Sequence, residues 1–229
     1  MTREAVAERV WSSLRQEAGL PTEAETDAEA LASTVRALAY HEAGHAAARA
    51  ALLGRAAGLL SVSILPVADS GFAAAVMYTV RGRRRRRRLC RADMLAVIMI
   101  DAAGDVARSL AFPLQPGLSE ALAEDPDWSQ GCPARSDADE CQFHASLLAE
   151  GAWTVERVRR LAAAWTRELL EVPAVWRAVE QCAAELVEHG EISGAEPLGR
   201  IFGGLREALH DPALRRRWFR RLPGVFDGP

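Results

Sequence analysis

The segment Tyr40-His41-Glu42-Ala43-Gly44-His45 places two imidazoles four residues apart, with a carboxylate directly after the first. On an α-helix, residues four apart are separated by about 40° around the axis and about 6 Å along it. Both rings can therefore reach one ion, while Glu42 lies about 100° away on the flank of that face. In this H-E-x-x-H pattern the histidines bind zinc and the glutamate activates a zinc-bound water. We expect His41 and His45 to be metal ligands and Glu42 to be catalytic.

The surrounding sequence favours this interpretation over a chance occurrence of the pattern. In a chance occurrence, both histidines would be ordinary polar groups of the surface or core. The pattern is flanked by alanine-rich segments, 37–39 and 46–53, which are typical of a buried helix. An unpaired histidine or glutamate in such an environment is energetically unfavourable. We therefore expect a zinc site in the interior of a long helix.

The composition is that of an ordinary globular protein. Of the 229 residues, 49% are apolar and 26% are charged. The net charge of −3 says nothing about partners, because an acidic N-terminal segment offsets two basic clusters, Arg81–Arg91 and Arg215–Arg221. No apolar run reaches the roughly eighteen residues of a membrane span, and the first residues lack the apolar stretch of a signal peptide. We therefore expect a cytoplasmic protein without a transmembrane segment.

The four cysteines form no C-x-x-C pair, so we expect free thiols at Cys90, Cys132, Cys141 and Cys182. The arginine run itself, 81–88, cannot be buried and should form an extended loop. A solvated linker is the plain interpretation, and an anionic substrate, a membrane surface or nucleic acid are the alternatives. Nucleic acid is disfavoured because no aromatic residues are interleaved for base stacking.

Apolar periodicity predicts a mainly α fold with a small β-hairpin after the zinc helix. We expect a docking helix in the region 1–24, a domain that contains the zinc site over 25–205, and a basic tail over 206–229. The arginine-rich loop 81–91 and an irregular insertion at 113–135 should interrupt this domain. We expect Thr26 or Asp27 to cap the zinc helix and Gly190–Gly194 to close the fifth helix. The expected helices are 4–17, 27–54, 92–110, 137–150, 153–170, 173–189 and a short final one, and the strands are 60–66 and 72–80.

A catalytic zinc site needs a third protein ligand. The extended metzincin pattern is not met, because Ala48 and Ala51 occupy the positions of its glycine and third histidine. A thermolysin-like site needs a glutamate a few turns downstream, but no glutamate occurs between Glu42 and Glu120. An aspartate, a distant glutamate, a cysteine or His144 remain as candidates.

Five segments together resemble the peptidase domain of the FtsH family of ATP-dependent zinc proteases, over about residues 35–200. The first, around the histidine pair, is specific, and the others are individually weak. The middle helix segment Gly104-Asp105-Val106-Ala107-Arg108 resembles the Gly-Arg-Ala-Ala-Glu of that family, with its charges altered. The segments are Ala39–Ala46, Val62–Pro66, Gly104–Arg108, Ser136–Glu140 and Leu186–Gly194.

The resemblance implies a zincin-like zinc metalloendopeptidase whose third ligand is an aspartate at the start of a helix. Asp137 is the best match and Asp139 the second, although either carboxylate would also stabilise a helix N-terminus. Cys141 and His144 share the helix face of Asp137 and would lie near the metal, where packing or an outer hydrogen bond is their expected role.

In many zinc proteases an edge strand binds the substrate backbone. We expect Gly71, Phe72 and Ala73 to bind the substrate in this way. No ATPase segment is present in the sequence, so we expect a peptidase without its own motor that acts on unfolded polypeptides or one specific protein. The resemblance also makes a homo-oligomer possible. The alternatives are a catalytically silent, zinc-bound regulatory module that binds a partner through its arginines, and a zinc hydrolase of a non-peptide amide.

Overall fold

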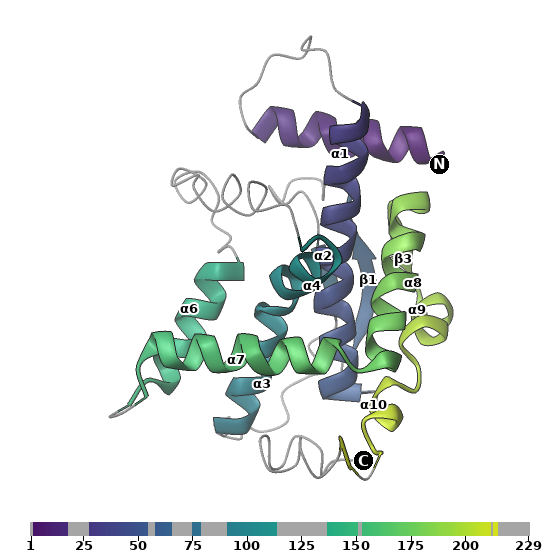
Figure 1. Cartoon of the computed structure of the whole chain (residues 1–229). Helices are drawn as coiled ribbons and strands as arrows, with labels where there is room; N and C mark the ends of the chain where they lie inside the picture. Colours follow the sequence, from purple (N-terminus) through teal and green to yellow (C-terminus); the bar gives the residue numbers. More distant parts are fainter. Residues whose placement is uncertain are drawn as a thin grey trace.

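The fold is mainly α-helical, as predicted (Figure 1). The computed structural model describes residues 2–17, 28–54, 58–65, 75–78, 91–113, 137–150, 153–211 and 213–214. Its helices are α1 (Arg3–Glu17), α2 (Ala28–Leu53), α3 (Arg91–Asp101), α4 (Ala103–Ala111), α6 (Asp137–Leu148), α7 (Val155–Leu170), α8 (Pro173–His189), α9 (Ala195–Phe202) and α10 (Leu205–Ala208). Its strands are β1 (Leu59–Ser63), β2 (Ala75–Tyr78) and β3 (Glu191–Ser193).

Helix α2 is the centre of the molecule, with α4 and α8 packed along it (Figure 1). Its alanines at 46, 47 and 48 are fully buried, as the alanine-rich flanks predicted. Gly44 is a point of very close approach, because a Cβ there would lie 2.5 Å from the carbonyl oxygen of Ala103 in α4. Small side chains thus bring α4 against the turn of α2 that carries the two histidines.

The region 92–110 forms two helices, and our prediction of a single continuous helix was wrong. The helix is interrupted at Ala102, between α3 and α4. Just before the break, the carbonyl group of Met99 accepts a hydrogen bond from the buried Thr166 hydroxyl (3.1 Å), and that of Ile100 accepts one from the His45 ring (2.7 Å). Side chains thus take the place of backbone donors at these two carbonyl groups. The break is therefore coupled to the histidine pair.

A small antiparallel sheet has the order β2-β1-β3. Strands β1 and β2 form the predicted pair, although β1 ends at Ser63, where the Ser63 hydroxyl accepts a hydrogen bond from the Leu65 N–H. Strand β3 lies in the segment 190–194, where we predicted only a helix-closing turn. Gly190 does end α8 at a positive φ of 80°, but Ile192 then pairs with Val62. Because β1 is central, β2 lies at one edge of the sheet.

Helices α1, α6, α7 and α8 follow the prediction closely. Helix α1 packs on α2 and α8, with Val6 and Val10 buried. The Thr154 hydroxyl caps α7 by accepting a hydrogen bond from the N–H of Arg157 (3.2 Å). Two short helices, α9 and α10, replace the single final helix that we predicted. None of the described helices is long and apolar enough to cross a membrane.

Several predictions concern segments outside the described residues. These are the capping residues Thr26 and Asp27, the arginine run, most of the insertion after residue 113 and the tail from residue 215. The three residues assigned to substrate binding, Gly71, Phe72 and Ala73, also lie outside. Among the cysteines within the described ranges, Cys141 and Cys182 are free thiols, as expected, and both are buried.

Candidate metal site

Three side chains converge between α2 and the start of α6. His41 and His45 lie one turn apart on α2, and Asp137 is the first residue of α6. The Oδ2 atom of Asp137 lies 2.9 Å from the Nε2 of His41 and 3.0 Å from the Nε2 of His45. The two Nε2 atoms are 3.1 Å apart. We call these three residues the His-His-Asp cluster, and they could hold one metal ion.

The outer nitrogens of both histidines face hydrogen-bond acceptors. The Nδ1 of His45 lies 2.7 Å from the carbonyl oxygen of Ile100, which can only accept. The Nδ1 of His41 lies 3.5 Å from Oδ1 of Asp105, and the Arg108 guanidinium holds that carboxylate at 3.0 Å. Protons are therefore assigned to both Nδ1 atoms, which leaves the Nε2 lone pairs pointing into the cluster. Such outer partners are typical of metal-binding histidines.

With neutral rings, the cluster contains three acceptor atoms and no donor. Two imidazole lone pairs and a carboxylate oxygen about 3 Å apart repel one another unless a proton or a cation lies between them. Without a metal, protons fill this role. Burial lowers the pKa of His41, but its contacts with Asp105 and Asp137 outweigh burial and raise the pKa to about 10. Burial raises the pKa of Asp137, but hydrogen bonds from His41 and His45 outweigh it and lower the pKa.

The dimensions of the cluster suit a zinc ion. Ligand atoms about 2.0–2.1 Å from a tetrahedral zinc are about 3.3 Å apart, so the cluster would need to open by only a few tenths of an ångström. The histidine side chains are 16% and 10% exposed, whereas Asp137 is 47% exposed. Solvent therefore reaches the cluster from the side of Asp137, which leaves room for a fourth, non-protein ligand.

Gly104 in α4 forms a closely fitting wall of the cluster. A Cβ at this position would lie 2.4 Å from Nε2 of His45 and 2.6 Å from Cε1 of His41. These separations are far below an ordinary van der Waals contact, so any side chain here would displace both rings. Glycine is thus required by space at this point of α4, even though it weakens a helix interior.

Glu42 is buried beside the cluster, with 6% of its surface exposed. Burial raises the pKa of its carboxyl group, and the neighbouring charges of His41 and His45 oppose that shift. Among the described residues, no donor forms a hydrogen bond to this carboxylate. A buried carboxylate without a protein donor is rare and needs a water or a cation as its partner.

The other proposed ligands lie outside the cluster. Asp139 is exposed on α6, and Cys141 is buried one turn after Asp137. His144 forms a hydrogen bond through Nδ1 to Asp101 (2.8 Å), which links α6 to the end of α3. Sequence reasoning placed Asp137, Cys141 and His144 on one face, and the structure brings only Asp137 to the histidines.

Three neighbours of the cluster were not assigned from the sequence: Gly104, Asp105 and Arg108. All three lie in the segment Gly104–Arg108, whose charges depart from the FtsH pattern. That departure was the one feature of the sequence that could have pointed to a role beside the metal site. Nothing in the sequence could predict the role of the Ile100 carbonyl group, because that role depends on the interruption of the helix after it.

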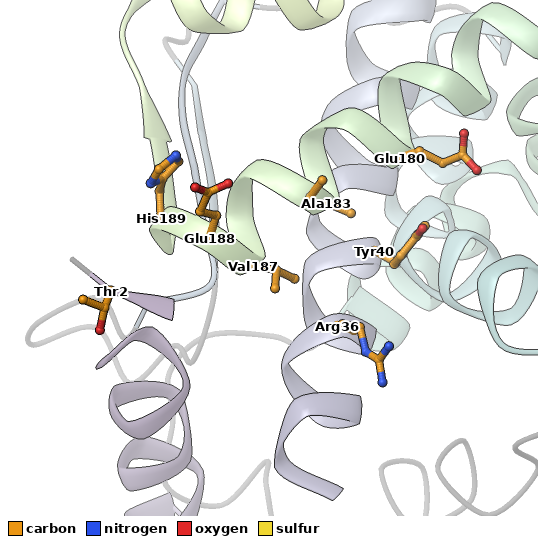
Figure 2. A pocket seen from close by; sticks show the side chains of 9 residues that line it. Thr2, Arg36, Tyr40, Glu180, Ala183, Val187, Glu188 and His189 are labelled. Carbon is orange, nitrogen blue, oxygen red and sulfur yellow. The ribbon is translucent and has the colours of Figure 1, made fainter. Parts of the chain in front are cut away.

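The larger of two cavities in the described part of the chain does not lie at the cluster. It measures about 590 Å³ and lies between the start of α1, α2 and α8. Figure 2 shows Arg36 and Tyr40 of α2 and Glu180 and Val187 of α8 among the residues that line it. The smaller cavity, of about 250 Å³, borders Asp137. The smaller cavity is therefore the one that adjoins the candidate functional site, because Asp137 lines it.

A scan against protein-family models finds no match, and neither does a search of curated proteins.

Proposed function

We propose that this chain is a zinc-dependent metallopeptidase with a zincin-like site related to that of the FtsH family. His41, His45 and Asp137 hold the ion, and Glu42 is the general base and acid. The observation that carries the proposal is the convergence of three acceptor atoms within 3.1 Å of one another, from segments more than ninety residues apart. Three acceptor atoms this close in a partly buried place need a proton or a cation between them, and a metal ion meets all three at once.

The partners of the cluster support a site that is organised in advance. The Ile100 carbonyl group and the Asp105 carboxylate fix the orientation of the two rings, and Arg108 fixes Asp105. When bound, zinc supplies Lewis-acid chemistry at the scissile carbonyl group. The exposed side of Asp137 is where a substrate would approach.

Glu42 moves the proton in the proposed reaction. It accepts a proton from the attacking water and passes it to the leaving amine. Its burial supports this role, because burial raises the pKa of the carboxyl group toward the working range of a general acid and base. Its lack of a protein hydrogen-bond donor among the described residues leaves the carboxylate available to a water molecule.

The proposed substrate is an extended, unstructured polypeptide. Strand β2 lies at a sheet edge, and an extended chain can pair with such an edge through its backbone. An unstructured polypeptide supplies such a strand more readily than a folded protein, because the edges of folded sheets are commonly covered, charged or short. Strand β2 packs on α2, where the guanidinium of Arg49, one turn after His45, lies 3.4 Å from the centre of the Tyr78 ring.

The test is proteolysis of casein, an unstructured protein, by zinc-loaded wild type and two variants. Glu42→Gln should keep its zinc and lose cleavage, because only the proton acceptor is changed. Glu188→Gln makes the same chemical change on the exposed surface of α8 and should cleave normally. If stoichiometrically loaded wild type leaves casein intact, or if Glu42→Gln cleaves it at the wild-type rate, the peptidase proposal is wrong. Unfolding upon chelation would instead favour a structural zinc site.

A further inference from the structure

The smaller cavity borders the His-His-Asp cluster and has an unusual charge distribution. It lies between α4, α6 and α7, and its charged lining residues are Asp101, Asp105, Asp137, Glu156, Arg159 and Arg160. Its volume of about 250 Å³ is below that of sites for whole drug-sized ligands, which measure about 300–1,000 Å³. A single amino-acid side chain or chain end fits a space of this size.

The acidic groups around this cavity already have partners. Asp101 bonds to His144 (2.8 Å), Asp105 to Arg108 (3.0 Å), and Asp137 to both histidines of the cluster. The fourth acid, Glu156, lies 3.5 Å from Arg160. These pairs leave no acid of the cavity wall without a partner.

Arg159 differs from these groups, because its partners are neutral. Its Nη1 donates to the amide oxygen of Gln142 (3.2 Å), and its guanidinium also hydrogen-bonds the thiol of Cys141. Burial raises the pKa of that thiol, and the positive charge of Arg159 opposes the shift. Among the described residues, no carboxylate forms an ion pair with Arg159. A half-buried guanidinium thus lines the cavity without an ion-paired carboxylate from the described residues.

We propose that this cavity binds a carboxylate of the substrate and that Arg159 selects it. The proposal rests on the peptidase function proposed above. A guanidinium is a planar donor that can hold a carboxylate with two parallel hydrogen bonds, which gives geometric selectivity as well as affinity. The carboxylate belongs either to an acidic side chain near the scissile bond or to the C-terminus of the substrate, since both present the same chemistry.

Cleavage of a peptide library by zinc-loaded enzyme tests this selectivity. The cut sites of wild type should show glutamate or aspartate enriched roughly tenfold or more at one position, or should lie at a fixed distance from the C-terminus. A second library with amidated C-termini separates these sources, because only the side-chain preference survives amidation. Arg159→Gln should remove the preference and Arg159→Lys should retain part of it. Arg160→Gln, whose charge is already paired with Glu156, is the matched control and should keep it.

A direct binding measurement separates this inference from the peptidase function. Titration of the zinc-loaded Glu42→Gln protein with N-acetylglutamate should shift the NMR signal of the Arg159 Nε–H, and N-acetylglutamine amide should not. A shift without any peptidase activity in wild type would refute the peptidase function and support the carboxylate site. The inference is wrong if the signal does not move, or if wild type and Arg159→Gln share the same cleavage preference.

Discussion

Replacing Gly104 by alanine should remove the metal site while the fold persists. The added Cβ would lie 2.4 Å from Nε2 of His45, whereas ordinary van der Waals contact begins at 3.4 Å, so the ring must retreat by about 1 Å. A cluster whose atoms are about 3 Å apart cannot absorb this movement and still hold one ion. Changes to residues that only hydrogen-bond to metal ligands lower metal affinity about 10–100-fold. Because Gly104→Ala would displace a ligand itself, we expect a loss of zinc affinity of roughly 100-fold or more.

The assay is competition for zinc against a chromophoric chelator, with circular dichroism as the measure of folding. Gly199→Ala is the matched control, because Gly199 lies in α9 and a Cβ there meets nothing within 4 Å. Alanine should stabilise that helix by up to about 1 kcal/mol, which raises the melting temperature by roughly 2–4 °C without changing zinc affinity. Wild-type zinc affinity in Gly104→Ala would refute the geometry of the site.

Three further predictions address packing, the helix break and pH. Gly44→Ala should destabilise the fold by about 1–3 kcal/mol, because its Cβ would lie 2.5 Å from a carbonyl oxygen of α4; a melting temperature at or above wild type would contradict this. Thr166→Val should cost about 1–3 kcal/mol in denaturant unfolding, because it leaves the buried Met99 carbonyl group without its donor; an unchanged midpoint would show that this bond is unimportant. In chelated protein, the raised pKa of His41 stabilises the fold fully below pH 6.5, and this contribution is lost as the pH rises toward 10. The lowered pKa of Asp137 stabilises the fold above about pH 3.8, and this contribution is lost as the pH falls further. Melting temperatures measured with and without zinc from pH 5 to 9 should therefore show a zinc-induced stabilisation that grows with pH, because the metal displaces protons. A zinc-induced rise in melting temperature that does not depend on pH would refute the proton-filled cluster.

Local features of the sequence were enough to predict most of the helices and the position of the histidine pair. The apolar spacing of α1, α7 and α8 reflects packing on one face of each helix, so periodicity locates them. His41 and His45 share a helix face for the same geometric reason. Asp137 could be proposed only from a resemblance, because nothing local indicates that the start of α6 meets the middle of α2.

The features that sequence reasoning missed depend on contacts between distant segments. Ala102 is a strong helix former, and the chain breaks there while the preceding carbonyl groups bond to Thr166 and His45. Strand β3 has three residues, too few for a periodic signal, and it exists because β1 offers an open edge. Tertiary context decides such short elements.

The proposed metal centre depends most directly on the carboxylate of Asp137, which lies 2.9 Å and 3.0 Å from the two histidine nitrogens. The decisive measurement is the zinc content of purified Asp137→Asn beside that of Asp139→Asn, which makes the same change two residues later on exposed surface. We predict one zinc per chain in wild type and in Asp139→Asn, and a large loss in Asp137→Asn. Equal zinc in all three proteins would contradict the proposed ligand set.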